Sequence, residues 1–377
     1  MGQPPFGDNP CPNRERFSLV HFDAMRRIAL LGATGSIGQQ ALEIIDAHPE
    51  LELVAAASGS RPIDGLAPLT QVGGDPTELL ERAQPDVVLN AVVGFAGLPA
   101  TLWALERGID LALANKESLV AAGELATAAW RRGGGRLLPV DSEHSAAYQC
   151  LEGRDPETVH SLVLTASGGP FRGRASEELA DVTPDEALAH PTWNMGPKIT
   201  IDSATLANKG LELIEAHFLF DLDYDRIEVV IHPTSTVHAL VRFRDGAALA
   251  HLGYPDMRVP ISFALSYPDR AATPIPPLDL ASGLTLEFEA PDLETFPLLT
   301  LAREAGERGG TYPCAFNAAN EVAVAAFRDG RLPFLAIAET VEETLGSVDG
   351  AAARDLNDLV EADAEARRLA ERTTTPA

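Results

Sequence analysis

Short apolar runs alternate with amphipathic segments over the first 150 residues. Between two of the runs, at residues 39–48, apolar side chains recur on one helical face. This alternation predicts βαβ units and therefore a parallel sheet that ends near residue 150. The predicted strands are residues 26–31, 51–58, 85–92, 109–115 and 135–140.

The pattern changes after about residue 160, where strand-like runs dominate and helices are few. This part predicts an α+β fold with a mixed or antiparallel sheet. Residues 268–300 are rich in proline and acidic side chains, which predicts a surface linker, and residues 300–372 have the periodicity of a helical bundle. The strand-like runs are residues 159–167, 198–202, 227–243 and 247–253.

Composition limits the classes of protein that fit. A length of 377 residues indicates two or three domains. With 55 acidic and 29 basic residues, the formal charge is −26, which disfavours nucleic acid and anionic membranes as partners. No apolar stretch approaches the length of a membrane span. An anionic substrate would therefore need a local concentration of donors.

The cysteines and the N-terminus indicate a cytoplasmic protein. The three cysteines, Cys11, Cys150 and Cys314, form no CxxC motif, which suits a reducing compartment. The first 24 residues lack the continuous apolar region of a signal peptide. We expect residues 1–25 to be a disordered extension, and Met25, directly before a strand-like run, is a candidate functional start.

A glycine-rich turn joins the first predicted strand to the first predicted helix. Gly32, Gly35 and Gly38 in "GATGSIG" would let backbone N–H groups approach a pyrophosphate at a helix N-terminus. The required context, a strand before and a helix after, is present, so the turn predicts dinucleotide binding. The alternative is a tight turn with no ligand.

The end of the second strand favours NADP over NAD. NAD-binding proteins usually carry an Asp or Glu there for the ribose 2′-hydroxyl, and this chain has none. It carries Gly59, Ser60 and Arg61, and hydroxyl and guanidinium groups suit a 2′-phosphate. Arg61 could instead be a solvated loop residue.

Two carboxylates follow the fifth predicted strand. If the strand continues through Asp141 and Glu143, its period of two points both side chains the same way, toward a hard divalent cation. A solvated strand end is the plain alternative, and a third oxygen ligand would decide against it. Glu212 and Glu215, in a downstream helical segment, both have suitable spacing.

Three further groups of residues fit an anionic substrate. Ser203, Asn208 and Lys209 cluster at a predicted helix start, and Ser167 precedes a Gly-Gly turn that is either an anion-binding nest or an ordinary turn. His190 and Trp193 lie on a loop bounded by proline and glycine, typical of a lid, although Trp193 could instead anchor that loop. His232 and His238, six apart on one face of an extended run, are more typical of structural histidines.

Several motifs occur together in the order found in one enzyme family. The chain resembles 1-deoxy-D-xylulose 5-phosphate reductoisomerase from about residue 26 to the end of the helical region, and the block at residues 190–216 is very specific. The motifs are "GATGSIG", "LANKESLV", "VDSEHSA", "TASGGPF", "HPTWNMGPKITIDSATLANKGLELIEA", "IHPTSTVHALVRF", "GYPDMRVPI" and "FNAANEVAV".

The resemblance implies a homodimer that uses NADPH and Mn²⁺ or Mg²⁺ in the non-mevalonate isoprenoid pathway. Its substrate would be 1-deoxy-D-xylulose 5-phosphate and its product 2-C-methyl-D-erythritol 4-phosphate. The carbon skeleton would rearrange by a retro-aldol and re-aldol sequence or by an α-ketol shift, and NADPH would then reduce the branched aldehyde.

The resemblance also implies roles for individual residues. It selects Glu212 over Glu215 as the third metal ligand, beside Asp141 and Glu143, and adds Lys116 to these three as the catalytic set. His144, His238 and Met257 would line or support the pocket. The implied substrate contacts are Lys116, Ser142, Glu143, Ser167, His190, Trp193, Ser203, Asn208, Lys209 and Glu212. The implied cofactor contacts are Thr34, Gly35, Ser36, Ile37, Gly59, Ser60, Arg61, Asn115, Glu117 and Gly196.

The expected fold class is α/β, with an N-terminal Rossmann-like parallel sheet, an α+β catalytic domain and a C-terminal helical bundle. The expected domains are residues 26–150 for NADPH, 151–267 for catalysis and dimerisation with a flap at 188–198, the linker 268–300, and 301–377. Family members often have Gly-Lys-Asn or Gly-Arg-Asn at residues 59–61 and a basic residue at the position of Pro197. We therefore expect the individual 2′-phosphate contacts and the flap stiffness to differ here, and the preference for NADP to be kept.

Two other functions remain open at this point. One is an NADP-dependent dehydrogenase without an isomerase step; an acylating type would need a nucleophilic cysteine, and the apolar context of Cys150 is poor for a thiolate. The other is a non-catalytic NADP sensor whose acidic cluster is only surface.

Overall fold

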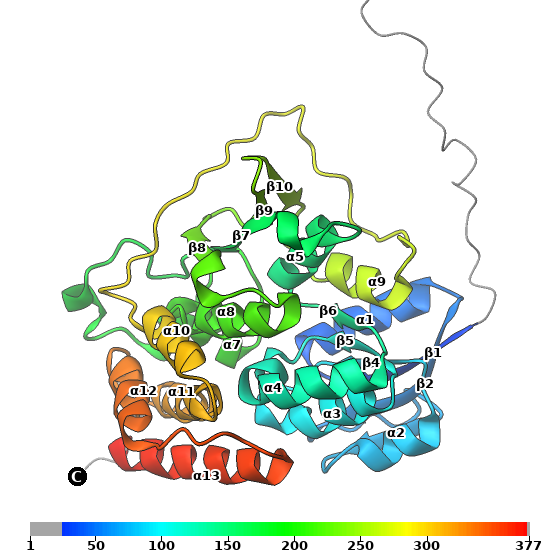
Figure 1. Cartoon of the computed structure of the whole chain (residues 1–377), viewed down its shortest axis with the longest axis horizontal. Coiled ribbons are helices and arrows are strands. Elements are labelled where there is room, and N and C mark those ends of the chain that lie inside the picture. The colour runs from blue at the N-terminus through cyan, green and yellow to red at the C-terminus, as the bar shows by residue number, and fades with distance from the viewer. Residues whose placement is uncertain (1–24, 375–377) are drawn as a thin grey trace, which may run out of the picture.

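A computed structural model of the chain describes residues 25–374 (Figure 1). The predicted disordered extension therefore lies outside the described residues, apart from Met25. Among the residues described, no helix combines the length and the apolar character needed to cross a membrane.

The N-terminal part is a six-stranded, wholly parallel sheet in the order β3-β2-β1-β4-β5-β6. Its central strands are apolar on both faces, as buried parallel strands require, and the order is that of dinucleotide-binding sheets. The strands are β1 (Arg26–Leu31), β2 (Leu51–Ser58), β3 (Leu69–Val72), β4 (Val87–Asn90), β5 (Asp110–Leu113) and β6 (Leu137–Pro139). Sequence analysis missed β3, a four-residue edge strand with only two apolar side chains.

Helices cover both faces of this sheet (Figure 1). One of them comes from far along the chain: α9 packs against α1 and contributes Ile261 and Leu265 to the same core as Ile28 and Leu30. The helices are α1 (Ser36–Ala47), α2 (Thr77–Ala83), α3 (Leu98–Glu106), α4 (Lys116–Gly133) and α9 (Arg258–Ser266).

The second part is built on a mixed four-stranded sheet in the order β10-β9-β7-β8. The β7 and β8 strands are parallel, whereas β9 runs antiparallel to β7 and β10. The strands are β7 (Val159–Ala166), β8 (Ile227–Ile231), β9 (Val237–Phe243) and β10 (Ala248–Leu252). The helices beside them are α5 (Ser142–Leu151), α6 (Pro184–Leu188), α7 (Pro197–Ala204) and α8 (Ala207–Phe220).

Two strand predictions in this part are wrong. Residues 198–202 are helical because Gly196 and Pro197 start α7, proline being favoured in the first helical turn, and this outweighs the β-branched "ITI". Residues 227–243 form two strands separated by a turn, so His232 and His238 do not share one extended face. Helices are also more frequent here than expected.

The chain then crosses the surface without regular structure apart from one bridge, Ile231 to Glu289, before the C-terminal helices begin. In Figure 1 this crossing segment arches over the second sheet. The final helices pack on one another and on α4, α7 and α8. They are α10 (Leu298–Arg308), α11 (Tyr312–Arg328), α12 (Ala336–Ser347) and α13 (Leu356–Thr373).

Candidate active site

A cavity of about 360 Å³ lies between the two sheets. Its walls come from the starts of α1, α4, α5 and α8, from the loop before α7, and from the turn before α9. Parallel strands place the loops that follow them at one edge, so residues distant in sequence converge here.

Three carboxylates converge on this cavity. Asp141 caps the N-terminus of α5, its Oδ1 accepting from the Glu143 N–H at 3.3 Å, and Glu143 lies in the first turn. Glu212 comes from α8, and one oxygen from each of the three lies within 4.8 Å of the others. The expected convergence is confirmed, but its reason was wrong: β6 ends at Pro139, so a helix cap rather than strand alternation aims the two side chains.

Two lysines lie among these carboxylates. Lys116 Nζ is 2.5 Å from Asp141 Oδ2 and 2.9 Å from both Glu212 Oε1 and Asn208 Oδ1. Lys209 Nζ is 3.0 Å from Glu143 Oε1 and also pairs with Glu212. The buried negative charge is thus largely balanced by side chains of the same site.

Burial and ion pairing shift the pKa values of these carboxylates in opposite directions. Burial raises the pKa of Glu143 to about 7, against the attraction of Lys209. Burial would also raise the pKa of Asp141, but Lys116 and His144 hold it well below its usual range. Buried oxygen donors of this kind fit a hard divalent cation, and Asp141, Glu143 and Glu212 can supply one ligand atom each.

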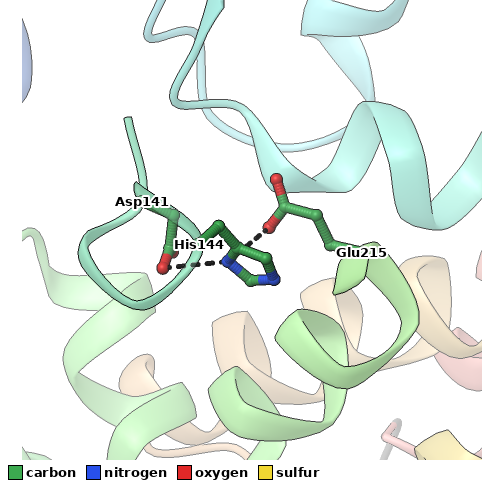
Figure 2. Close-up of side chains that lie close together, drawn as sticks. All are labelled: Asp141, His144 and Glu215. Carbon is green, nitrogen blue, oxygen red and sulfur yellow. Dashed lines mark hydrogen bonds and ion pairs between the residues drawn. The ribbon is translucent and has the colours of Figure 1, made fainter. Parts of the chain in front are cut away.

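A second cluster, Asp141, His144 and Glu215, shares Asp141 with the first (Figure 2). His144 Nδ1 is 3.2 Å from Asp141 Oδ1 and 3.5 Å from Glu215 Oε2, while its Nε2–H donates to the Glu212 carbonyl at 2.9 Å. These carboxylates, with Glu215 first, overcome the effect of burial and raise the pKa of His144 to about 9. Glu212 lines the cavity and Glu215 does not. Glu215 is therefore placed to hold His144 rather than to face a ligand.

The residues predicted for phosphate binding line the same cavity, and two of them, Asn208 and Lys209, contact its carboxylates directly. Ser167, His190, Trp193, Ser203, Asn208 and Lys209 all line the cavity. His190 Nδ1 accepts from the N–H groups of Thr192 and Trp193 at 3.1 and 2.9 Å, so its Nε2–H donates to Ser167 Oγ at 2.9 Å. Burial lowers the pKa of His190, which keeps the ring neutral.

The glycine turn has the geometry expected for a dinucleotide. Gly32 has φ +83°, and a Cβ there would lie 2.4 Å from the Ala91 carbonyl oxygen. Gly35 is the N-cap of α1, and Ser36 and Ile37 of its first turn line the cavity. The N-terminus of α1, where a helix leaves N–H groups free, therefore lies at the wall of the cavity.

The other predicted cofactor residues surround this turn. Gly59, Ser60 and Arg61 are exposed after β2, and Arg61 donates to the Thr34 carbonyl at 3.2 Å, which places its cation beside the turn. Gly196 lines the cavity. Asn115 and Glu117 are buried beside Lys116 and bond to each other at 3.1 Å, but they do not line the cavity.

The remaining pocket residues divide into two groups. Met257 lines the cavity, and His238 is buried behind Trp193, with ring centroids 6.2 Å apart. His232 stacks on Phe288 and contacts the Glu287 carbonyl, so it holds the crossing segment instead. Lys198, which pairs with Glu117 at 3.1 Å, was not predicted from the sequence; its position two residues after Gly196 was the available signal.

The parallel nucleotide-type sheet, the glycine turn and the carboxylate–lysine site define a dinucleotide-dependent, metal-assisted class of enzyme. Residues 28–73 and 69–123 match the family 1-deoxy-D-xylulose 5-phosphate reductoisomerase, and residues 137–220 match the C-terminal domain of that family. Residues 252–369 match the DXP reductoisomerase C-terminal domain. The chain belongs to the 1-deoxy-D-xylulose 5-phosphate reductoisomerase family.

Individual relatives cover nearly the whole chain. The reductoisomerase of Geobacillus kaustophilus is 50% identical over 375 residues, which is 91% of this chain and 98% of the relative. That of Thermomicrobium roseum is 50% identical over 344 residues, 84% of this chain and 89% of the relative.

Solved structures of relatives superpose closely. The Zymomonas mobilis enzyme in complex with NADPH has a TM-score of 0.85 at 40% identity and covers 93% of this chain and 100% of its own. A DOX-P reductoisomerase in complex with NADPH, fosmidomycin and magnesium has a TM-score of 0.85 at 39% identity and covers 93% and 98%.

Proposed function

We propose that the protein converts 1-deoxy-D-xylulose 5-phosphate to 2-C-methyl-D-erythritol 4-phosphate with NADPH and Mg²⁺ or Mn²⁺. The observation that carries the proposal is the convergence of Asp141, Glu143 and Glu212 with Lys116 at the nucleotide edge of the sheet, in a chain of this family. One relative of known structure is a complex with NADPH, and another is a complex with NADPH, fosmidomycin and magnesium.

Asp141, Glu143 and Glu212 are the proposed metal ligands, and the bound cation would polarise the substrate ketone and a neighbouring hydroxyl. Lys116 places a positive charge beside the reacting carbonyl and holds Asp141 and Glu212 in position. Ser142 reaches a substrate oxygen. His144 orients Asp141 from behind.

The proposed phosphate site is Ser167, Ser203, Asn208 and Lys209, closed by His190 and Trp193 from the flap. Phosphate binding is remote from the reacting carbons, so its binding energy can close the flap, exclude water and orient the substrate. The glycine turn and residues 59–61 would hold NADPH, which would supply the hydride for the reduction.

We assign residues 26–150 to NADPH binding, 151–267 to catalysis and dimerisation, 268–300 to a linker and 301–377 to a helical domain. The exposed apolar side chains of the edge strand β10 support a homodimer. Buried Cys150 and Cys314, both free, are consistent with a cytoplasmic protein.

A dehydrogenase with a cysteine nucleophile is not favoured. Cys150 does not line the cavity, and burial raises the pKa of its thiol, which disfavours a reactive thiolate.

The test is NADPH absorbance with 1-deoxy-D-xylulose 5-phosphate, with and without a chelator. We expect turnover that stops on chelation and returns with added Mg²⁺. Turnover at the same rate with and without the chelator would contradict the proposal. The absence of any NADPH oxidation would contradict it as well.

A further inference from the structure

The chain contains only three lysines among its 29 basic residues, namely Lys116, Lys198 and Lys209. All three are largely buried, with side chains 6%, 17% and 4% exposed. Because arginine fills every other basic position, the retained lysines indicate places that need a compact ammonium group. Two of them belong to the site already described, which leaves Lys198 to be explained.

Lys198 lies next to the cavity without lining it. It is in the first turn of α7, two residues after Gly196, and the cavity-lining residues Gly196 and Ile199 flank it. Its Nζ is 3.1 Å from Glu117 Oε1 and 3.0 Å from Asp202 Oδ2. Burial alone would lower the pKa of Lys198, but these two carboxylates raise it, so the ammonium group stays charged.

Through Glu117, Lys198 is connected to the edge of the parallel sheet. The second oxygen of Glu117 accepts from Asn115 Nδ2 at 3.1 Å. The same Asn115 nitrogen donates to the carbonyls of Val92 and Gly94, at 2.7 and 2.9 Å. Lys198 thereby joins the end of the flap to the segment that carries Lys116.

Through Asp202, Lys198 is also connected to the C-terminal helices. Asp202 Oδ1 accepts from Asn320 Nδ2 of α11 at 2.8 Å. The neighbouring Glu321 accepts from the Phe95 N–H at 3.2 Å and pairs with Arg367 of α13 at 2.6 Å. Two helices of the C-terminal part therefore support the same junction.

We propose that Lys198 is a positioning residue for hydride transfer: by tying Gly196 to the Asn115–Glu117 segment, it sets where the nicotinamide of NADPH lies relative to Lys116. The inference rests on the proposed function, because hydride transfer requires the nicotinamide to lie beside the substrate site that holds Lys116. Gly196 lines the same cavity as Lys116, and Asn115 and Glu117 flank Lys116 in the chain. The ammonium group pairs with α4 directly and is connected to α11 through Asp202, and a displacement of about 1 Å at a reacting centre can cost about 100-fold in rate.

The test is Lys198→Met, which keeps the length of the side chain and removes its charge. We expect kcat to fall about 10- to 100-fold and the Kd of NADPH, followed by tryptophan fluorescence, to rise about tenfold, a loss of about 1.4 kcal/mol. The primary isotope effect with NADPH deuterated at the transferred position should increase, because hydride transfer becomes slower than the other steps.

Two further variants keep the proposal falsifiable. Asn320→Ala removes only the far support of Asp202 and should shift the same three quantities less, which decides the matter if Lys198→Met does not fold. Arg331→Met removes an exposed ion pair with Asp329 and should shift none of them.

A lower melting temperature in Lys198→Met, with kcat, NADPH affinity and isotope effect unchanged, would reduce Lys198 to a structural residue and overturn the proposal. Failure of the proposed function is separate, because the wild-type protein would then not oxidise NADPH with the substrate. Titration of the Lys198→Met variant with NADPH would still test whether Lys198 positions the cofactor.

Discussion

Buried charge in this protein is concentrated around one cavity. Asp141, Glu143 and Glu212 would repel one another strongly in a dry site, yet Lys116 and Lys209 lie within ion-pair distance of them. Removing one partner of such a group leaves another buried and unpaired, which is far more costly than losing an exposed pair. Substitutions here should therefore affect chemistry and stability together.

Glu143→Gln tests the proposed metal site while keeping the shape of the side chain. We expect kcat to fall by about 100-fold or more, because one anionic ligand becomes neutral, while the Kd of NADPH stays nearly constant. The measurements are steady-state kinetics at saturating Mg²⁺ and fluorescence titration with NADPH.

The control for this variant is Glu152→Gln, an exposed carboxylate at the other end of α5. It should behave as wild type. Near-normal turnover of Glu143→Gln at saturating Mg²⁺ would remove Glu143 from the ligand set.

His238 should make the protein sensitive to acid. Burial, with a further contribution from His251, lowers its pKa from 6.5 to about 4. The unfolded chain therefore takes up a proton below pH 6.5 that the folded chain refuses until about pH 4, so stability is lost as the pH falls through this window. The loss at this residue reaches about 3 kcal/mol at most.

His238→Gln should weaken this pH dependence. We expect the fall in unfolding free energy between pH 7 and pH 4.5, measured by denaturant titration, to be smaller in the variant than in wild type. His160→Gln, at an exposed position, is the control. Parallel curves for His238→Gln and wild type would show that this histidine does not titrate differently on folding.

At the residue scale, the chemistry of the site residues could be predicted from the sequence more reliably than the orientation of their side chains. Asp141 and Glu143 were paired correctly because both carboxylates follow a buried strand, but the helix cap that aims them depends on where that strand ends. Lys198 was missed because its meaning depends on Glu117, which is 81 residues away, and no local pattern encodes such a contact.

At the scale of elements, the turn between β1 and α1 is tightly constrained by backbone. Gly38 lies in the first turn of α1, where the helix packs closely on the turn that follows β1. A Cβ at this position would lie 2.3 Å from the Gly32 carbonyl oxygen. Backbone is the obstacle, so no side-chain rotation can relieve the contact. The turn must therefore shift if Gly38 is replaced.

Gly38→Ala should destabilise the protein by at least about 2 kcal/mol and weaken NADPH binding. Thermal unfolding and NADPH titration measure the two effects. Gly346→Ala is the matched control, because its Cβ meets nothing within 4 Å in α12 and alanine favours helix by about 0.5–1 kcal/mol. Equal behaviour of the two variants would contradict the packing argument.

Long elements with a continuous apolar pattern were predicted from the sequence. Short elements, and elements whose residues favour two different structures, were not. The β1, β2 and β7 strands were found because their apolar runs are continuous. By contrast, β3 escaped because an edge strand needs few apolar residues, and α7 escaped because its β-branched residues favour a strand while its capping residues favour a helix.

At the scale of the molecule, the two sheets leave different edges exposed. The β10 strand is one edge of the mixed sheet and exposes Leu249 and Leu252, with exposed Tyr254 just after it, whereas β3 is an edge of the parallel sheet. An exposed apolar edge strand invites pairing with another chain. The proposed homodimer would use this edge.

Leu249→Lys tests that surface. We expect light scattering after gel filtration to show twice the chain mass of 40.0 kDa for wild type and a shift toward one chain for the variant. Val72→Lys, on the exposed edge strand β3, should leave the mass unchanged. A wild-type monomer, or a variant dimer as stable as wild type, would contradict this use of β10.

The scarcity and burial of lysine have a practical consequence for chemical labelling. Reagents that acylate primary amines normally modify many surface lysines, but here every lysine side chain is at most 17% exposed and lies in or beside the cavity. Such reagents should therefore act mainly at the α-amino group. Any slower, additional modification seen by mass spectrometry should coincide with loss of turnover and be prevented by ligands that fill the cavity.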